Sequence, residues 1–214
     1  YGVWNHIKNS GKFPEAKNLT LEWVGMIPGK RESRRFEGLH ILSQREIISQ
    51  ARHEDDVSFG GWSIDLHPSD GVFSPLAVSN HWYSRGIYGI PYRCLFSRNI
   101  KNLFLAGRII SVSHVAFGST RVMATCAHSA QAVGLAAAIC REERVLPDKL
   151  AFGSPMRSLQ RRLQRAGQHI PGCRLEDPDD LASSAAKTVS SSLRLRDLPA
   201  DGPMIPLAMD RAKM

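Results

Sequence analysis

The sequence predicts an α/β domain, and three observations support this fold class. Short apolar runs of strand length alternate with segments of helical periodicity. Glycine-rich turns such as Gly60-Gly61 separate several of these runs. A long segment, residues 119–140, carries small residues at spacings of three and four. The composition, 43% hydrophobic and 22% charged over 214 residues, fits one folded core with extensions.

The first half of the chain predicts four strands and one helix. Residues 19–25 alternate in the manner of a strand, and residues 38–42 form another that leads into a helix. Ser43 and Glu46 form an S-x-x-E capping box at the start of that helix. Residues 57–59 and 62–66 are predicted strands on either side of Gly60-Gly61.

The central segment predicts a strand, a glycine turn, a loop and a long helix. After a strand at residues 92–96, a continuous apolar run at 103–106 suits a strand buried on both faces, and Gly107 and Arg108 end it. A helix is expected to open at Gly118 and to carry one face nearly bare of side chains. Its first amides would then point out of the fold toward an electron-rich or anionic ligand, such as a flavin ring.

The C-terminal part predicts one more helix, followed by a change in amino-acid composition. Ser154 and Pro155 begin a helix that ends at Gly167. Beyond residue 171 the chain is rich in Pro, Gly, Ser and Asp, which is typical of linkers. We therefore expect one domain over residues 1–170, followed over 171–214 by a linker and the start of a β-rich module.

Three stretches resemble one known family. They are IPYRCLFSRNIKNLFLAGRIISVSHVAFGSTRVMATCAHSAQAVGLAAA, PGKRESRRFEGLHILSQREI and GGWSIDLHPSDG, within roughly residues 21–172. They are similar to the C-terminal portion of the FAD-binding domain in FAD-dependent oxidoreductases of the two-dinucleotide-binding-domain type. The resemblance implies FAD as cofactor and a partial Rossmann-like FAD/NAD(P)-binding fold with a mixed sheet.

The resemblance also implies two sets of FAD contacts. The glycine turn would lie against the ribityl chain and pyrophosphate, and the helix start would face the pyrimidine edge of the flavin. The first set is Ala106, Gly107 and Arg108, and the second is Gly118, Ser119, Thr120, Arg121, Val122 and Met123.

One expected part of such a fold does not occur in these residues. Proteins of this type begin with a strand, a G-x-G-x-x-G turn and a helix that hold the ADP half of the cofactor. The chain contains no G-x-G. We therefore expect a fragment, inactive alone, that lacks the N-terminal dinucleotide-binding unit and needs the remainder of its own polypeptide as a partner.

Two residues are predicted to be catalytic. Arg121 would add positive charge near the N1/O2 locus of the flavin. Similarity to the fumarate-reductase group implies a second role, in which Arg121 grips a substrate carboxylate, and the alternative to both is that it only ties the helix start to nearby carbonyls. His114 lies between the two inferred flavin contacts and is a candidate proton donor or acceptor. His67 is predicted to face a small-molecule substrate, and the resemblance implies the same for Arg34 and Arg35.

Other function classes find less support. The net charge of +8 invites a nucleic-acid partner, but the Lys and Arg runs lack interleaved aromatics, so none is expected. The four cysteines form no C-x-x-C, and no metal site is expected. The small and apolar stretch at residues 130–140 is followed by charges, so no membrane span is expected.

Three hypotheses about function remain open. The first is a flavoprotein oxidoreductase fragment that uses FAD to oxidise or reduce an unidentified small organic or carbohydrate-derived substrate. The second is a non-catalytic binding or assembly domain that retains the flavoprotein fold. The third is a basic module that binds polyanions.

Overall fold

The computed structural model describes residues 1–27, 29 and 31–181, which fall into two compact units. The first unit is Tyr1–Ser33, and the second begins at Arg34. This division lies inside the predicted domain of residues 1–170. Most of the predicted linker and β-rich module, from residue 182 on, lies outside the described residues, so the predicted boundary near residue 170 stays a prediction.

The first unit holds the helix α1 (Gly2–Asn9) and the 3-10 helix η1 (Pro14–Asn18). The Lys8 ammonium group joins them, because Nζ donates to the carbonyl oxygens of Ala16 at 3.0 Å and Leu19 at 2.8 Å. Residues 19–25 are irregular and exposed, so the strand predicted there is wrong. Their apolar side chains, such as Trp23 at 78% exposure, find no second strand among the described residues of the unit.

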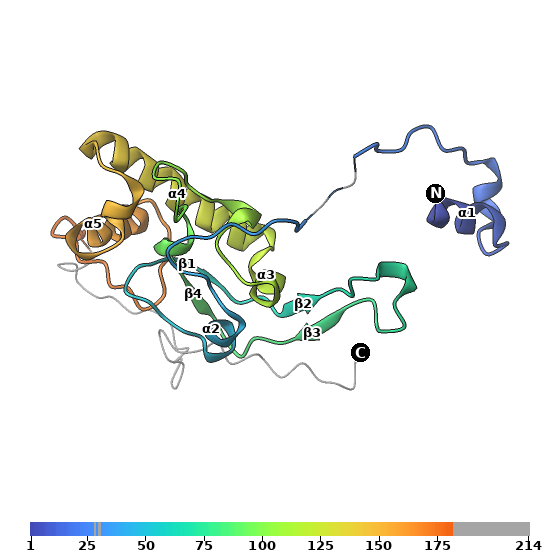
Figure 1. Ribbon diagram of the computed structural model, residues 1–214, viewed down its shortest axis with the longest axis horizontal. Coiled ribbons are helices and arrows are strands. Elements are labelled where there is room, and N and C mark those ends of the chain that lie inside the picture. Colours follow the sequence, from blue (N-terminus) through green and yellow to red (C-terminus); the bar gives the residue numbers. More distant parts are fainter. Residues whose placement is uncertain (28, 30, 182–214) are drawn as a thin grey trace, which may run out of the picture. The chain divides into compact units, whose positions relative to one another are not determined.

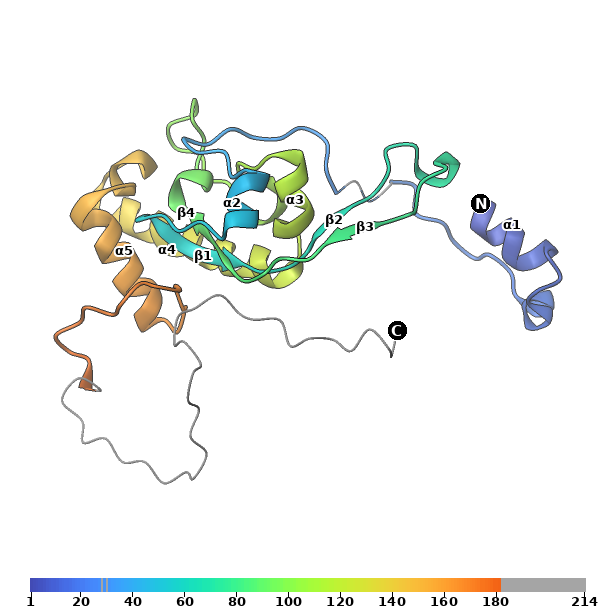
Figure 2. The same cartoon turned by 90° about the horizontal axis from the view of Figure 1, so that it is seen from below.

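The described part of the second unit forms two small antiparallel sheets (Figure 1). Strand β1 (Asp56–Gly60) pairs with β4 (Tyr88–Pro91), with a register shift between Asp56 and Ser58. Strand β2 (Ile64–Leu66) pairs with β3 (Asn80–Trp82), and the two form an arm that leads to the 3-10 turn η2 (Gly71–Phe73), as Figure 2 shows. The strands predicted around Gly60-Gly61 are confirmed as β1 and β2.

Three other predicted strands are wrong or reduced to single bridges. Residues 92–96 begin with the 3-10 helix η3 (Tyr92–Cys94), because the strand lies earlier, in β4. Residues 38–42 and 103–106 contribute only the bridges Leu42↔Val112 and Phe96↔Phe104. The mixture of helices and sheets is compatible with the predicted α/β class. The sheets of the described residues are small and antiparallel, however, so a Rossmann-like mixed sheet is only implied by the family resemblance.

The helix α2 (Gln44–Ser49) begins as predicted. The Ser43 hydroxyl accepts from the backbone N–H of Glu46, and the Glu46 carboxylate accepts from the backbone N–H of Ser43. These reciprocal bonds satisfy two amides that the first helical turn leaves without intrahelical partners.

The long helix does not open at Gly118, and that prediction is wrong. A separate helix, α3 (His114–Thr120), begins earlier and is capped by the Ser113 hydroxyl, which accepts from the backbone N–H of Ala116. The chain then becomes extended at Val122, and α4 (Met123–Glu143) follows. Gly118, Ser119 and Thr120 therefore form the last turn of α3.

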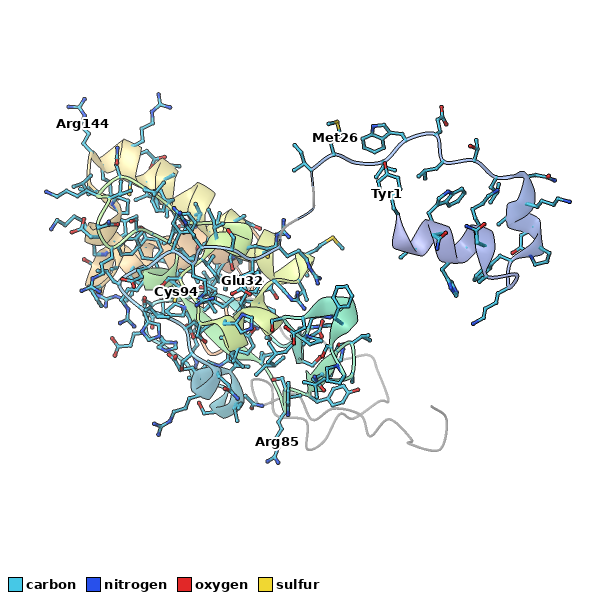
Figure 3. All side chains as sticks on the ribbon, turned by 45° about the vertical axis from the view of Figure 1, so that its right-hand side comes forward. Tyr1, Met26, Glu32, Arg85, Cys94 and Arg144 are labelled. Carbon is cyan, nitrogen blue, oxygen red and sulfur yellow. The ribbon has the colours of Figure 1, made fainter. Side chains whose placement is uncertain are left out.

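Helix α4 packs on β1 and on the C-terminal elements, the 3-10 helix η5 (Pro147–Leu150) and the helix α5 (Gly153–Arg165). Its buried face consists of Thr125, Ser129, Ala132, Ala136 and Ile139. Its predicted small-residue face, which includes Ala124, Ala127, Ala130 and Gly134, is exposed. Figure 3 shows Cys94 among the side chains of this unit and Arg144 at the far end of α4.

Helix α5 begins two residues before Pro155 and ends close to the predicted Gly167. Gly167 adopts a φ of +84°, and the amide of Gln168 donates to the carbonyl of Leu163 at 2.9 Å. This is the Schellman arrangement, in which a left-handed residue turns the chain back over the last helical carbonyls.

By length and composition, α4 is the one helix of the described residues that could cross a membrane. It has 21 residues and so extends beyond the small and apolar run at 130–140. A single helix of this kind is weak evidence for a span, because core helices of soluble domains meet the same criterion. Here one face of α4 packs on β1 and α5.

Candidate functional site

The predicted glycine turn is a 3-10 turn, η4 (Gly107–Ile109), that packs against α4. Gly107 has a φ of +65°, and a Cβ atom built there meets no other atom within 4 Å. Arg108 is exposed. Burial raises the pKa of the Cys126 thiol in the first turn of α4, and the positive charge of Arg108 partly offsets that rise. The turn therefore presents backbone and a guanidinium beside the beginning of α4.

Helix α4 begins without a side-chain cap. Val122 is the N-cap residue, and the first intrahelical bond runs from the Cys126 amide to the Val122 carbonyl at 3.0 Å. The amides of Met123, Ala124 and Thr125 consequently have no intrahelical acceptor, and the helix dipole places partial positive charge there. Met123 is 89% exposed. This helix start has the donor chemistry that an anionic or electron-rich group requires.

The last turn of α3 is filled by the protein's own contacts. The Ser119 hydroxyl donates to the carbonyl of Trp62 at 2.6 Å and lies 2.7 Å from the Tyr88 hydroxyl. A Cβ atom on Gly118 would lie 2.8 Å from the Asp65 carbonyl oxygen. Gly118 and Ser119 are thus buried, and the amide-rich helix start predicted for them lies instead at Val122 and Met123.

Thr120, in the same turn, is also buried. Its Oγ1 has no hydrogen-bond partner among the described residues. It immediately precedes the break between α3 and α4.

A cleft of about 370 Å³ adjoins the start of α4. It lies between the end of β1 and the first turns of the helix, and it is lined by Phe59, Gly60, Gly61, Ala124, Thr125, Ala127, His128 and Gln131. The α4 wall carries the small side chains of Ala124 and Ala127, which the small-residue spacing predicted as a face nearly bare of side chains. On the β1 wall, the places that side chains at Gly60 and Gly61 would take are filled by Tyr88 and Ile87.

His128 lines this cleft, although the sequence did not single it out as a site residue. Its ring packs edge-on against Phe59, with centroids 5.0 Å apart. Burial lowers the pKa of His128, and the nearby His169 lowers it further. The available signal was position: His128 stands four residues after Ala124 and therefore shares its helical face.

A second group of polar residues gathers at the base of the β2–β3 arm, around Asp65. The Arg121 guanidinium donates to the Asp65 carboxylate at 2.9 Å and to its carbonyl oxygen at 3.0 Å. The Ser79 hydroxyl donates to the same carboxylate at 2.6 Å. Nε2 of His67 and of His81 lie 3.2 and 3.4 Å from it. We call these five residues the Asp65 cluster.

The pKa of Asp65 reflects these neighbours. Burial alone would raise it, but the Ser79 hydrogen bond and the charges of His67, His81 and Arg121 outweigh burial, so the pKa lies below its ordinary value. The side chains of His67 and His81 are 42% and 40% exposed, whereas that of Arg121 is 11% exposed. The histidines therefore form the accessible edge of the cluster.

The structure brings together two of the predicted site residues, Arg121 and His67, through Asp65. His114 is the first residue of α3, and Arg121 follows its last, so about 10 Å of helix rise separates their backbones. Arg34 and Arg35 are exposed in irregular chain ahead of Gly38. The roles assigned to His114, Arg34 and Arg35 stay predictions.

The residues present suit FAD at the points just described. Unpaired amides at the start of α4 match the electron-rich edge of a flavin. The open space at Gly107 lets backbone approach a phosphate or sugar chain, and Arg108 supplies charge beside it.

The family model described as FAD dependent oxidoreductase matches residues 1–163. No curated protein and no solved structure matches the chain. The family model covers well over half of the 214 residues and includes both η4 and α4. The chain therefore belongs to the FAD-dependent oxidoreductase family, and FAD is the cofactor that this membership implies.

Proposed function

We propose that this chain forms the flavin-facing part of an oxidoreductase that acts on a small organic or carbohydrate-derived substrate. The observation that carries the proposal is that helix α4 starts without a side-chain cap. The same helix packs against the η4 turn. FAD, when bound, supplies the hydride and electron transfer itself. The residues of this chain would then bind, orient and exchange protons.

Two contacts are assigned to the cofactor. The amides of Met123, Ala124 and Thr125 would donate to the pyrimidine edge of the flavin, where negative charge increases on reduction. Ala106, Gly107 and Arg108 would lie along the ribityl and pyrophosphate part. Gly118 and Ser119 would not contact the cofactor. Their contacts to β2 and β4 would hold α3, and thereby the start of α4, in position.

The Asp65 cluster is assigned to the substrate side. Arg121 is held by Asp65 through two acceptors, which supports a positioning role for Arg121 rather than direct contact with the flavin. The exposed edges of His67 and His81 are available for proton exchange with a substrate. Trp62 and Trp82, each about half exposed, lie on the same arm and could stack on a sugar or other ring.

The basic run on α5 gives less support to the polyanion hypothesis than the sequence suggested. Arg162 pairs with Glu142, and Arg165 pairs with Asp177 and Asp179. These carboxylates offset part of the positive charge that a phosphate backbone would need to meet.

The experiment that tests the proposal removes one amide at the start of α4. Met123→Pro deletes a single N–H at the first helical position, where proline is tolerated, and Val122 already has the extended backbone that precedes proline. In the full-length protein we expect FAD to bind about tenfold more weakly, the loss of one charge-assisted hydrogen bond. The flavin midpoint potential should also fall.

The matched control is Met123→Ala, which keeps the N–H and removes the same side chain. Fluorescence titration of FAD and a spectroelectrochemical titration provide the two measurements. Equal affinity and equal potential in Met123→Pro and Met123→Ala would show that this helix start does not contact the flavin, and the proposal would fail.

A further inference from the structure

A second constellation of functional side chains surrounds α2, and it includes neither the α4 cleft nor the Asp65 cluster. His40 precedes the helix, Glu46 lies in its first turn and His53 follows it. Nε2 of His40 lies 2.6 Å from Oε1 of Glu46, and Nε2 of His53 lies 3.0 Å from the same oxygen. One ligating atom from each residue thus falls within 4.8 Å of the others.

The carboxylate of Glu46 is held so that one oxygen faces both rings. Its Oε2 accepts from the Ser43 amide at 2.8 Å and from the Ser43 hydroxyl at 2.6 Å. The capping box therefore occupies one oxygen and directs the other toward His40 and His53. The centroids of the two imidazole rings lie 5.2 Å apart.

A second carboxylate supports His53 from behind. Nδ1 of His53 lies 3.2 Å from Oδ1 of Asp56, and Oδ2 of Asp56 accepts from the His53 amide at 3.0 Å. A metal-ligating histidine almost always donates its other ring N–H to a carboxylate or a carbonyl, which fixes the tautomer and the ring orientation. Asp56 stands in that relation to His53.

Without an ion, this hydrogen-bond network needs several ring N–H groups to donate at the same time. With both carboxylates ionised, both Nε2 atoms would donate to the single Oε1 of Glu46, and His53 would also donate through Nδ1 to Asp56. A cation at the meeting point takes the place of both Nε2 protons and leaves Nδ1 of His53 as the donor to Asp56. Each polar atom named then has one partner of the right kind.

We propose that His40, Glu46 and His53 bind a divalent first-row transition ion such as Zn²⁺, with Asp56 positioning His53. Two imidazoles and one carboxylate are a known zinc ligand set that leaves a fourth position for water or substrate. The side chains are 25%, 19% and 14% exposed, so an ion can reach them. Ligand atoms around a tetrahedral Zn²⁺ are about 3.3 Å apart. The His40–Glu46 pair, at 2.6 Å, would therefore have to separate by about 0.7 Å, and the His53–Glu46 pair, at 3.0 Å, by about 0.3 Å.

The consequence for the fold is a link across α2. The ion would join the chain before the helix to the chain after it, and so fix a short helix of six residues at both ends. The site does not depend on the proposed flavin contacts, because none of its residues lines the cleft at α4.

The test uses Co²⁺ as a spectroscopic substitute for Zn²⁺, with the full chain and without added flavin. Equilibrium dialysis with elemental analysis should give one bound ion per chain, and visible d–d absorption should show nitrogen and oxygen ligands at low coordination number. His40→Gln, Glu46→Gln and His53→Gln should each weaken binding at least tenfold. Asp56→Asn should weaken it about 10- to 100-fold.

The matched control is His169→Gln, which removes an exposed histidine of the same unit and should leave binding unchanged. Glu46→Gln is the decisive variant, because glutamine retains the capping box while the ligand charge is lost. Circular dichroism confirms that this variant is folded. The proposal is overturned if the parent chain binds less than one ion, or if Glu46→Gln and the parent chain bind Co²⁺ equally.

Discussion

Asp65 shows how much a single residue decides in this molecule. It lies in the short strand β2 and meets side chains from the loop after β2, from β3 and from the end of α3. The sequence pointed to Arg121 and His67 individually but gave no sign that one carboxylate joins them. Their spacing along the chain is 54 residues, so only folding brings them together.

The lowered pKa of Asp65 predicts a pH dependence of stability. A carboxyl group whose pKa is lower in the folded state contributes stability above its unfolded pKa and loses it as pH falls through the folded value. Between about pH 5 and pH 3 the parent chain should therefore lose more unfolding free energy than Asp65→Asn. Urea denaturation at several pH values measures this.

The control for this prediction is Asp70→Asn, which changes an exposed aspartate on the same arm. Its pH profile should follow that of the parent chain. If Asp65→Asn and Asp70→Asn give the same profile, the Asp65 cluster does not contribute pH-dependent stability.

At the scale of elements, the contact between α3 and β2 determines where the long helix can begin. Gly118 lies against the backbone of β2, and Ser119 binds the Trp62 carbonyl just before that strand. Arg121 then turns to Asp65, and the chain becomes extended at Val122. The start of α4 is exposed because α3 is fixed to β2 and cannot continue into it.

Gly118→Ala tests this contact. A Cβ atom would lie 2.8 Å from the Asp65 carbonyl oxygen and 3.2 Å from its amide nitrogen, and neither backbone atom can move independently. We expect the substitution to lower the unfolding free energy by about 1–3 kcal/mol, which exceeds the gain of under about 1 kcal/mol in helix propensity. Thermal and chemical denaturation provide the measurement.

Gly134→Ala is the matched control. Gly134 is on the exposed face of α4, where an added Cβ meets nothing within 4 Å. This variant should be as stable as the parent chain or more stable by up to about 1 kcal/mol. A Gly118→Ala protein that gains stability to the same extent would contradict the proposed packing of α3 on β2.

At the scale of the whole molecule, helix α5 is hydrogen-bonded to the chain segment at the start of β1. Nε2 of Gln160 in α5 donates to the carbonyls of Glu54 at 2.8 Å and Asp56 at 2.9 Å. Gln160 is 7% exposed, so these bonds are largely shielded from water. They hold chain segments more than 100 residues apart, and both segments lie within the part that the family model matches.

Gln160→Leu should destabilise the second unit. The change leaves two carbonyls without their donor in a buried place, and we expect a loss of roughly 2–4 kcal/mol. Gln164→Leu is the control on the same helix, because Gln164 is half-buried and makes one bond, to the Cys173 carbonyl at 2.7 Å. It should lose no more than about 1 kcal/mol. Urea unfolding curves with equal losses would show that the anchor to β1 has no special role.

Prediction from sequence succeeded where the signal was local. The capping box of Ser43 and Glu46, the end of α5 at Gly167 and the glycine turn at Gly107 all depend on residues a few positions apart. The family was recognised for a related reason, because its motifs are continuous stretches of chain. The predicted start of the long helix was wrong because Gly118 satisfies a local rule for opening a turn, whereas in the structure it packs closely on β2.

The sequence by itself determined the family, its cofactor and the short-range turns and caps, because each is written in neighbouring residues. Only the tertiary structure decided where α4 presents its free amides, which charges surround Asp65 and that His40, Glu46 and His53 converge. The physical reason is that these features depend on distances between atoms far apart in the chain. Such distances are set by the packing of α3, β2 and α2, and the helix or strand propensities of single residues do not predict this packing.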